Sequence, residues 1–203
     1  MFLNATEPFL FHLSPKGQAG VVLSKGALTS KTGGEGDIRA ALVKEANVID
    51  CIVNLPAKLF LNTQIPAALW FMRRDRENSS QYRDRSGEIL FIDARQLGHL
   101  INRRTRELSA EDIELISSTY HNWRNQDGDY QDVAGFCASV STEQVAELDY
   151  VLTPGRYVGL ADDEDDFDFT GRFNSLKAEF EAQLQEEARL NALIQEQLAK
   201  VVV

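Results

Sequence analysis

The sequence contains few cysteines and no long apolar run. Its two cysteines among 203 residues, Cys51 and Cys137, are too few and too far apart for a disulfide framework, and they indicate reduced thiols. No apolar stretch approaches the roughly 20 residues that a membrane-spanning helix needs. The first residues lack the basic segment that begins a secretory signal. These absences predict a cytoplasmic globular protein with no membrane association.

The common signatures of catalysis and metal binding are also missing. The three histidines, His12, His99 and His121, stand far from each other and from both cysteines, so no zinc spacing exists and they are interpreted as structural or surface residues. There is no G-x-S-x-G nucleophile motif. The Gly-rich segment 33–36 lacks the G-K-[ST] ending of a phosphate-binding loop and is interpreted as an ordinary loop. Composition and short motifs therefore assign no metal site and no catalytic residue.

The net charge of −10 is unevenly distributed. Residues 1–161 hold 17 Lys and Arg against 20 Asp and Glu, a net of −3, whereas residues 162–203 hold 4 against 11, a net of −7. An acidic chain does not bind nucleic acid through its overall charge. A local basic groove remains compatible with this distribution, because most of the excess lies in the last fifth of the chain.

The first part of the chain alternates strand and helix patterns. Apolar runs at 18–24, 48–55 and 67–72 predict three strands, the first of them buried, and residues 89–93 predict a fourth. Between the first two of these strands, apolar residues follow a helical period from Asp37, which indicates a parallel strand–helix–strand unit. The connection 56–66 shows no helical pattern, which favours a long functional loop between antiparallel neighbours.

Helices dominate the rest of the chain. A helix is expected after Ser109, which is a favourable N-cap followed by acidic residues, and an N-terminal helix is expected to end near Leu13. The acidic run 162–168 lacks the spacing of a calcium-binding loop and is interpreted as a solvated linker. Residues 172–200 predict one long amphipathic helix. Its apolar stripe consists of Phe173, Leu176, Phe180, Leu184, Leu190, Ile194, Leu198 and Val201.

Two basic segments are candidates for phosphate contacts. Arg73, Arg74 and Arg76 form one, and Arg103, Arg104 and Arg106 form the other. Acidic residues alternate with both, so a solvated face is the alternative interpretation of each.

One longer stretch indicates a family. Residues 55–71, LPAKLFLNTQIPAALWF, resemble the L-P-x-x-L-F-x-x-T-x-I-P-x-x-L-W-F segment of the modification subunits of type I restriction–modification systems. Further stretches match the same family in the same order: residues 20–23, 34–39, 89–95, 120–123, 135–137 and 149–158. The resemblance covers essentially the whole chain.

The resemblance implies an N6-adenine DNA methyltransferase that uses S-adenosylmethionine. The expected fold is α/β: the C-terminal half of a Rossmann-like methyltransferase sheet, with about three core strands plus one extra, followed by a mainly helical tail. In this superfamily the last strand inserts antiparallel between the two before it. The family's Gly-rich cofactor motif and N-P-P-F catalytic motif do not occur in this sequence. We therefore expect the C-terminal two-fifths of such a subunit, with no cofactor bound and no activity for this chain alone.

The resemblance also suggests site residues. Phe60 matches the aromatic that related adenine methyltransferases place against an adenine extruded from the duplex, and a core aromatic is the alternative. Asn62, Thr63 and Gln64 are candidates either for DNA contacts or for shaping the loop. The catalytic acceptor of the adenine amine belongs to the missing motif, so no catalytic residue is assigned.

The expected partners are DNA and the other subunits of a type I complex, the DNA-specificity subunit and the restriction subunit. The expected domains are residues 1–108, the methyltransferase half-domain; 109–161, a helical or irregular extension; 162–171, the acidic linker; and 172–203, the long helix. An alternative function is a non-catalytic assembly module that docks on the specificity subunit through that helix. Self-association through the helix or an exposed sheet edge is a further expectation.

Overall fold

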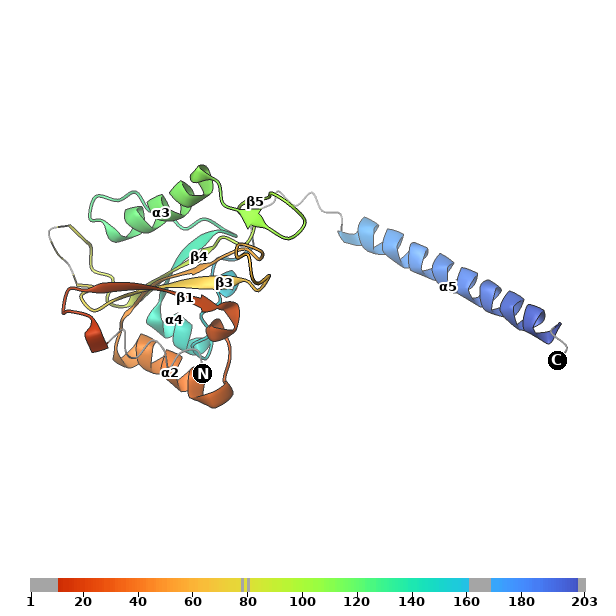
Figure 1. Ribbon diagram of the computed structural model, residues 1–203, viewed down its shortest axis with the longest axis horizontal. Coiled ribbons are helices and arrows are strands. Elements are labelled where there is room, and N and C mark those ends of the chain that lie inside the picture. Colours follow the sequence, from red (N-terminus) through yellow and green to blue (C-terminus); the bar gives the residue numbers. More distant parts are fainter. Residues whose placement is uncertain (1–10, 78, 80, 161–168, 201–203) are drawn as a thin grey trace. The chain divides into compact units, whose positions relative to one another are not determined.

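Five short apolar segments form one mixed sheet in the computed structural model, which describes residues 11–77, 79, 81–160 and 169–200 (Figure 1). The strands are β1 (Gln18–Ser24), β2 (Ile49–Asn54), β3 (Ala67–Arg73), β4 (Glu88–Asp93) and β7 (Cys137–Ser141). Their order in the sheet is β1-β3-β2-β4-β7. A separate two-stranded hairpin consists of β5 (His99–Leu100) and β6 (Arg106–Glu107).

The position of β3 sets the topology of this sheet. β3 pairs antiparallel with both β1 and β2, for example through Val21 opposite Trp70 and Val53 opposite Leu69. β1 and β2 therefore run parallel to each other on either side of β3, and β2 pairs parallel with β4. This confirms two sequence predictions: the connection 56–66 joins antiparallel neighbours, and the third strand lies between the first two.

One strand prediction was wrong, and one strand was missed. β1 was expected to be buried, but its residues alternate between exposed and half-buried, and Val22 is 55% exposed. β1 pairs only with β3 and forms one edge of the sheet, so part of its surface has no neighbouring strand. The opposite edge strand, β7, was not predicted, because its sequence Cys-Ala-Ser-Val-Ser has small side chains and only one β-branched apolar residue.

Short helices cover both faces of the sheet. α2 (Glu35–Ala40) continues as a π-helical turn, Ala41–Glu45, and it lies with α4 (Thr142–Glu147) on one face, while α3 (Ala110–Arg124) lies on the other (Figure 1). Ser109 accepts a hydrogen bond from the backbone of Asp112 in a capping box, which confirms the predicted start of α3. Single 3₁₀ turns span Lys25–Leu28, Thr32–Gly34 and Pro154–Arg156.

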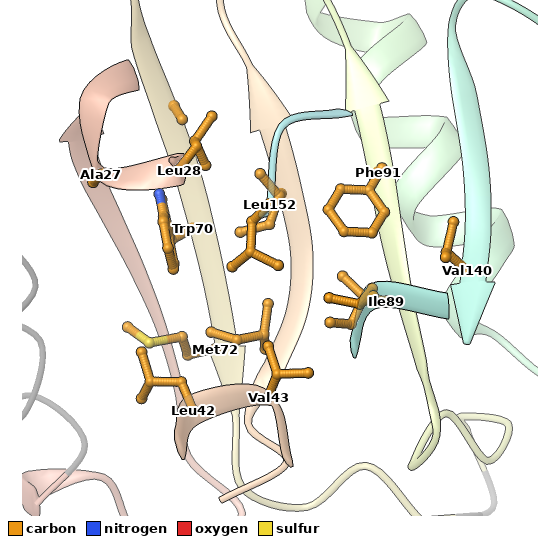
Figure 2. Close-up of a cluster of buried hydrophobic side chains, with 14 of the residues drawn as sticks. Ala27, Leu28, Leu42, Val43, Trp70, Met72, Ile89, Phe91, Val140 and Leu152 are labelled. Atoms are coloured by element: carbon orange, nitrogen blue, oxygen red, sulfur yellow. The ribbon is translucent and has the colours of Figure 1, made fainter. Parts of the chain in front are cut away.

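Two buried clusters hold the helices against the sheet. Trp70, Met72 and Phe91 point toward the face of α2 and α4, where they pack with Leu42 and Val43 (Figure 2). The alternate side chains of the same strands point to α3. They form the second cluster, which includes Cys51, Val53, Leu90, Ile92 and Trp123. Each large apolar side chain buried in this way stabilises the fold by about 1.5–3 kcal/mol.

The chain divides into two compact units, Met1–Ala161 and Asp162–Val203, and the second contains the helix α5 (Phe169–Ala199). α5 confirms the long helix that the sequence predicts, and six of its predicted stripe residues are exposed: Phe173, Leu176, Phe180, Leu184, Leu190 and Ile194. The acidic run, the side chain of Leu198, Val201 and most of the expected N-terminal helix lie outside the described residues. No described helix is long and apolar enough to cross a membrane.

Candidate functional site

A long loop connects β2 to β3 at the edge where the parallel strands β1 and β2 end. In α/β sheets the carboxyl ends of parallel strands are the usual place for a ligand site. The loop, residues 55–66, contains no helix, and Phe60 and Thr63 form a backbone bridge near its tip. Lys58 adopts a left-handed backbone conformation with a φ of 70°, which redirects the chain before Phe60.

Phe60 lies on the surface of this loop rather than in the core. Its side chain is 41% exposed, and it belongs to neither buried cluster. It lines a groove of about 260 Å³ together with the carboxyl end of β1 and the start of β3. The other lining residues are Val22, Leu23, Ser24, Thr63, Ile65, Pro66 and Ala67. In the part of the chain that the structure describes, Phe60 is therefore a surface residue of the loop and not a member of either buried cluster.

The three polar residues after Phe60 differ in their surroundings. Asn62, Thr63 and Gln64 are all exposed. The hydroxyl of Thr63 accepts a hydrogen bond from the backbone N–H of Ile65 at 3.1 Å, so this side chain shapes the loop. The side chains of Asn62 and Gln64 make no hydrogen bond with any residue that the structure describes. The structure leaves these two amides accessible to solvent or to a ligand.

Lys58 is a residue of the site that the sequence patterns did not single out. Its ammonium group donates a hydrogen bond to the carbonyl of Arg103 at 3.1 Å, and its own carbonyl accepts one from the backbone N–H of Arg106 at 2.9 Å. These bonds attach the Phe60 loop to the β5–β6 hairpin. The only sequence signal was a lysine two positions before Phe60 in a loop, and this signal says nothing about a partner more than 40 positions away.

One arginine of the first basic segment, Arg76, is part of a buried network, whereas Arg73 is half-buried and Arg74 is exposed. Arg76 and Arg85 each donate a hydrogen bond to Asp50 at 3.2 Å, and the hydroxyl of Tyr120 donates another at 2.5 Å. Asp50 and both arginines are at most 2% exposed. Burial lowers the pKa of Arg76, and the charge of Asp50 offsets part of this effect. The network joins Arg76 and Arg85 to Asp50 of β2 and, through Asp50, to Tyr120 of α3, so Arg76 is not a phosphate contact.

The other candidate groups form no site. The Gly-rich segment 33–36 makes a turn in which Gly33 and Gly34 have positive φ angles, and Glu35 is buried behind it. Both thiols are free and buried, and burial raises the pKa of Cys51. Within the described ranges, no three His, Cys, Asp or Glu residues come together to hold a metal ion.

The fold and the loop define a class of protein. A strand inserted antiparallel between two parallel strands, with an exposed aromatic in the adjoining loop, is the arrangement expected for the C-terminal half of a Rossmann-like methyltransferase sheet. A family model described as N-6 DNA Methylase matches residues 6–166. The chain belongs to this family.

Individual relatives agree with the resemblance drawn from residues 55–71. The chain is 43% identical to the type I restriction enzyme HindI methylase subunit of Haemophilus influenzae over 190 residues, which are 93% of this chain and 41% of the relative. It is 35% identical to the MjaIX methylase subunit of Methanocaldococcus jannaschii over 93% of this chain and 33% of the relative. The chain therefore spans about two-fifths or less of these curated relatives.

A solved structure shows the same fold. The crystal structure of a type I restriction–modification methyltransferase subunit from Streptococcus thermophilus superposes with a TM-score of 0.61 at 30% identity. The match covers 76% of this chain and 30% of that subunit. The expected α/β half-sheet is thereby confirmed.

Proposed function

We propose that this chain is the target-contacting part of an N6-adenine DNA methyltransferase subunit in a type I restriction–modification complex. The observation that carries the proposal is the position of Phe60. Its ring is exposed in a groove at the carboxyl edge of the sheet, on a loop whose sequence matches the family motif. Family membership supplies the reaction class.

An enzyme that methylates the amine of a paired adenine must first extrude that base from the duplex. Extrusion costs a few kcal/mol in lost stacking and pairing. An exposed aromatic ring recovers part of this energy, because base–aromatic stacking contributes about 1–3 kcal/mol. Phe60 has the ring type and the exposure for this role, and the amides of Asn62 and Gln64 next to it can hydrogen-bond a base edge or a phosphate.

The family reaction needs S-adenosylmethionine as the methyl donor. The described residues do not fit a site for it. Gly33 and Gly34 precede a helix of six residues, α2, whose first residue Glu35 is buried and whose first turn also contains Asp37. The family's own cofactor motif does not occur in the sequence. We therefore assign base contact to this chain and no step of methyl transfer. The chain alone is expected to be inactive.

The test uses duplexes in which one adenine is unpaired opposite an abasic site, because such an adenine leaves the stack at little cost. The full chain is titrated into labelled duplexes with the unpaired or the paired adenine, and the affinity ratio is measured by fluorescence anisotropy. Phe60→Ala is expected to reduce the preference for the unpaired adenine by about 5- to 150-fold.

Two further variants provide controls in the same loop. Phe60→Trp keeps an aromatic ring and is expected to keep the preference. Leu61→Ala removes a neighbouring side chain that is 91% exposed and is expected to change the ratio little. An unchanged ratio in Phe60→Ala contradicts the proposal.

A second role, assembly, is favoured by α5. This helix of 31 residues exposes its apolar stripe along the described length, with Phe180 60% and Leu184 47% exposed. Such a stripe is stabilised when it packs against another helix. We propose that α5 docks on the DNA-specificity subunit of a type I complex, and that the restriction subunit joins the same assembly.

A further inference from the structure

The two basic segments of the sequence have different environments in the fold. In the first, Arg76 is buried against Asp50, and Arg73 donates a hydrogen bond to the carbonyl of Asp75 at 2.7 Å while its guanidinium lies 4.5 Å from the centre of the Tyr82 ring. Arg73 and Arg76 are therefore engaged within the fold. The second segment has two arginines with no such role.

Arg103 and Arg104 lie at the tip of the β5–β6 hairpin, and both are exposed. Their side chains form no hydrogen bond or ion pair with the part of the chain that the structure describes. The backbone beneath them is fixed, because the side-chain oxygen of Asn102 accepts hydrogen bonds from the backbone N–H groups of Arg104 at 2.8 Å and Thr105 at 2.9 Å. Two guanidinium groups are thus presented from an ordered turn.

The base of the hairpin is also fixed. The guanidinium of Arg106 donates hydrogen bonds to the carbonyls of Leu97 at 2.8 Å and Gly98 at 2.9 Å. Gly98 has a φ of 77°, and a Cβ atom at this position would lie 2.6 Å from the carbonyl oxygen of Glu107. Only glycine allows the two strands to approach this closely. Arg106 therefore has a structural role, unlike the two arginines at the tip.

The hairpin and the Phe60 loop are joined through Lys58. Its hydrogen bond to the carbonyl of Arg103 and the bond from Arg106 to its own carbonyl hold the hairpin tip beside the loop. The hairpin lies at the same end of the sheet as the connection to β3 (Figure 1). The two exposed guanidinium groups thus belong to a hairpin that is hydrogen-bonded directly to the Phe60 loop.

We infer that Arg103 and Arg104 bind the phosphate backbone of duplex DNA beside the adenine-contacting loop. The inference deepens the proposed function and rests on it. Guanidinium groups match the bidentate geometry of phosphate oxygens, and phosphate contacts fix the register of a protein on the duplex without reading its sequence. The carboxylate of Asp112 accepts hydrogen bonds from the backbone N–H groups of Ser109 and Gly98, and it forms no ion pair with Arg103 or Arg104.

The chain-wide acidity does not oppose this contact. The unit that contains the hairpin, residues 1–161, carries a net charge of −3, whereas residues 162–203 carry −7. Residues 101–107 hold three arginines and one glutamate, so the hairpin itself has a net positive charge.

The experiment measures the affinity of the full chain for a labelled duplex between about 50 and 200 mM salt. Each phosphate contact contributes about 0.9 to the slope of log affinity against log salt. Arg103→Ala/Arg104→Ala is expected to reduce this slope by about 1.8 and to weaken binding equally for paired and unpaired adenine. The matched control Lys16→Ala/Lys44→Ala removes the same charge from two exposed positions elsewhere and is expected to leave the slope nearly unchanged.

The outcomes separate this inference from the proposed function. If the arginine variant lowers the slope while Phe60→Ala leaves the preference for unpaired adenine intact, the phosphate contact holds and the adenine contact fails. An unchanged slope, a loss equal to that of the lysine control, or no DNA binding at low salt overturns the phosphate contact. If the arginine variant binds DNA like the wild type but loses binding to a protein subunit of the complex, the hairpin is a protein contact and the inference is wrong.

Discussion

Replacing Asp50 by Asn tests the buried charge network behind the site. The substitution keeps the shape of the side chain and removes its charge. Asp50 is 1% exposed and accepts hydrogen bonds from Arg76, Arg85 and Tyr120. The variant leaves two buried guanidinium groups without a carboxylate. The NH₂ group of Asn, which takes the place of one carboxylate oxygen, is a hydrogen-bond donor and cannot accept the bonds that this oxygen accepted.

The size of the effect follows from this geometry. Removing one partner of a buried ion pair destabilises a protein by about 3–5 kcal/mol, because an uncompensated charge remains in the interior. Both arginines face the same carboxylate at 3.2 Å, so we expect a loss in the upper part of this range. A single domain has about 5–15 kcal/mol of stability in total. The variant is therefore expected to unfold at a much lower denaturant concentration.

Trp70 and Trp123 are fully buried in the first unit and are the only tryptophans in the chain, so their fluorescence reports its unfolding in urea. Asp149→Asn is the matched control, since Asp149 pairs with Lys31 and both side chains are 68% exposed. The control is expected to leave the unfolding midpoint almost unchanged. A destabilisation of Asp50→Asn below about 1 kcal/mol would refute the claim that this carboxylate compensates the buried arginines.

Three further predictions address the tail, the pH dependence and the isolated activity. Phe180→Asp/Leu184→Asp is expected to abolish self-association in light scattering and binding to the specificity subunit, with unchanged tryptophan fluorescence; unchanged association contradicts the assembly role. Burial alone would raise the pKa of Glu88, but hydrogen bonds from Arg83 and Ser139 outweigh it and leave the pKa lowered. A carboxyl group whose pKa is lower in the folded than in the unfolded state stabilises the fold above its unfolded pKa, and this stabilisation is lost as the pH falls through the folded pKa. Glu88→Gln is therefore expected to have a lower urea midpoint than the wild type at pH 7 and the same midpoint in acid. A difference in midpoint that is the same at every pH refutes this. The chain alone is expected to show no saturable S-adenosylmethionine binding in calorimetry and no methyl transfer to DNA, and transfer of labelled methyl groups contradicts the assignment of base contact without chemistry.

The sequence predicted the positions of four strands along the chain because local patterns carry that information. Residues 67–72 are a continuous apolar run and residues 48–55 are apolar except for Asp50 and Asn54, and Pro56 and Pro66 mark the ends of the loop between them. The absence of a helical period in 56–66 indicated antiparallel neighbours, and the structure confirms this. The family resemblance added the insertion of β3 between β1 and β2, which spacing alone does not give.

Non-local pairing accounts for what the sequence missed. Arg76 and Arg85 stand 26 and 35 positions from Asp50, in a segment that reads as a polar excursion. Nothing in the local pattern distinguishes these buried arginines from the exposed Arg103 and Arg104. The edge position of β1 is a property of the assembled sheet, because an apolar run has the same sequence pattern at an edge as in the centre. The exposed edge was therefore expected only from the family resemblance, in which the preceding half of the sheet is missing, and not from the run itself.

Photo-cross-linking to an azido-substituted adenine, unpaired opposite an abasic site, tests the central claim most directly. The full chain is irradiated with this duplex, and the cross-linked peptide is identified by mass spectrometry. The account predicts a cross-link within the loop 55–66, at or next to Phe60, and a much weaker signal when the same adenine is paired. A cross-link confined to another part of the chain, or an equal yield from paired and unpaired adenine, would contradict the assignment of this loop to the target base.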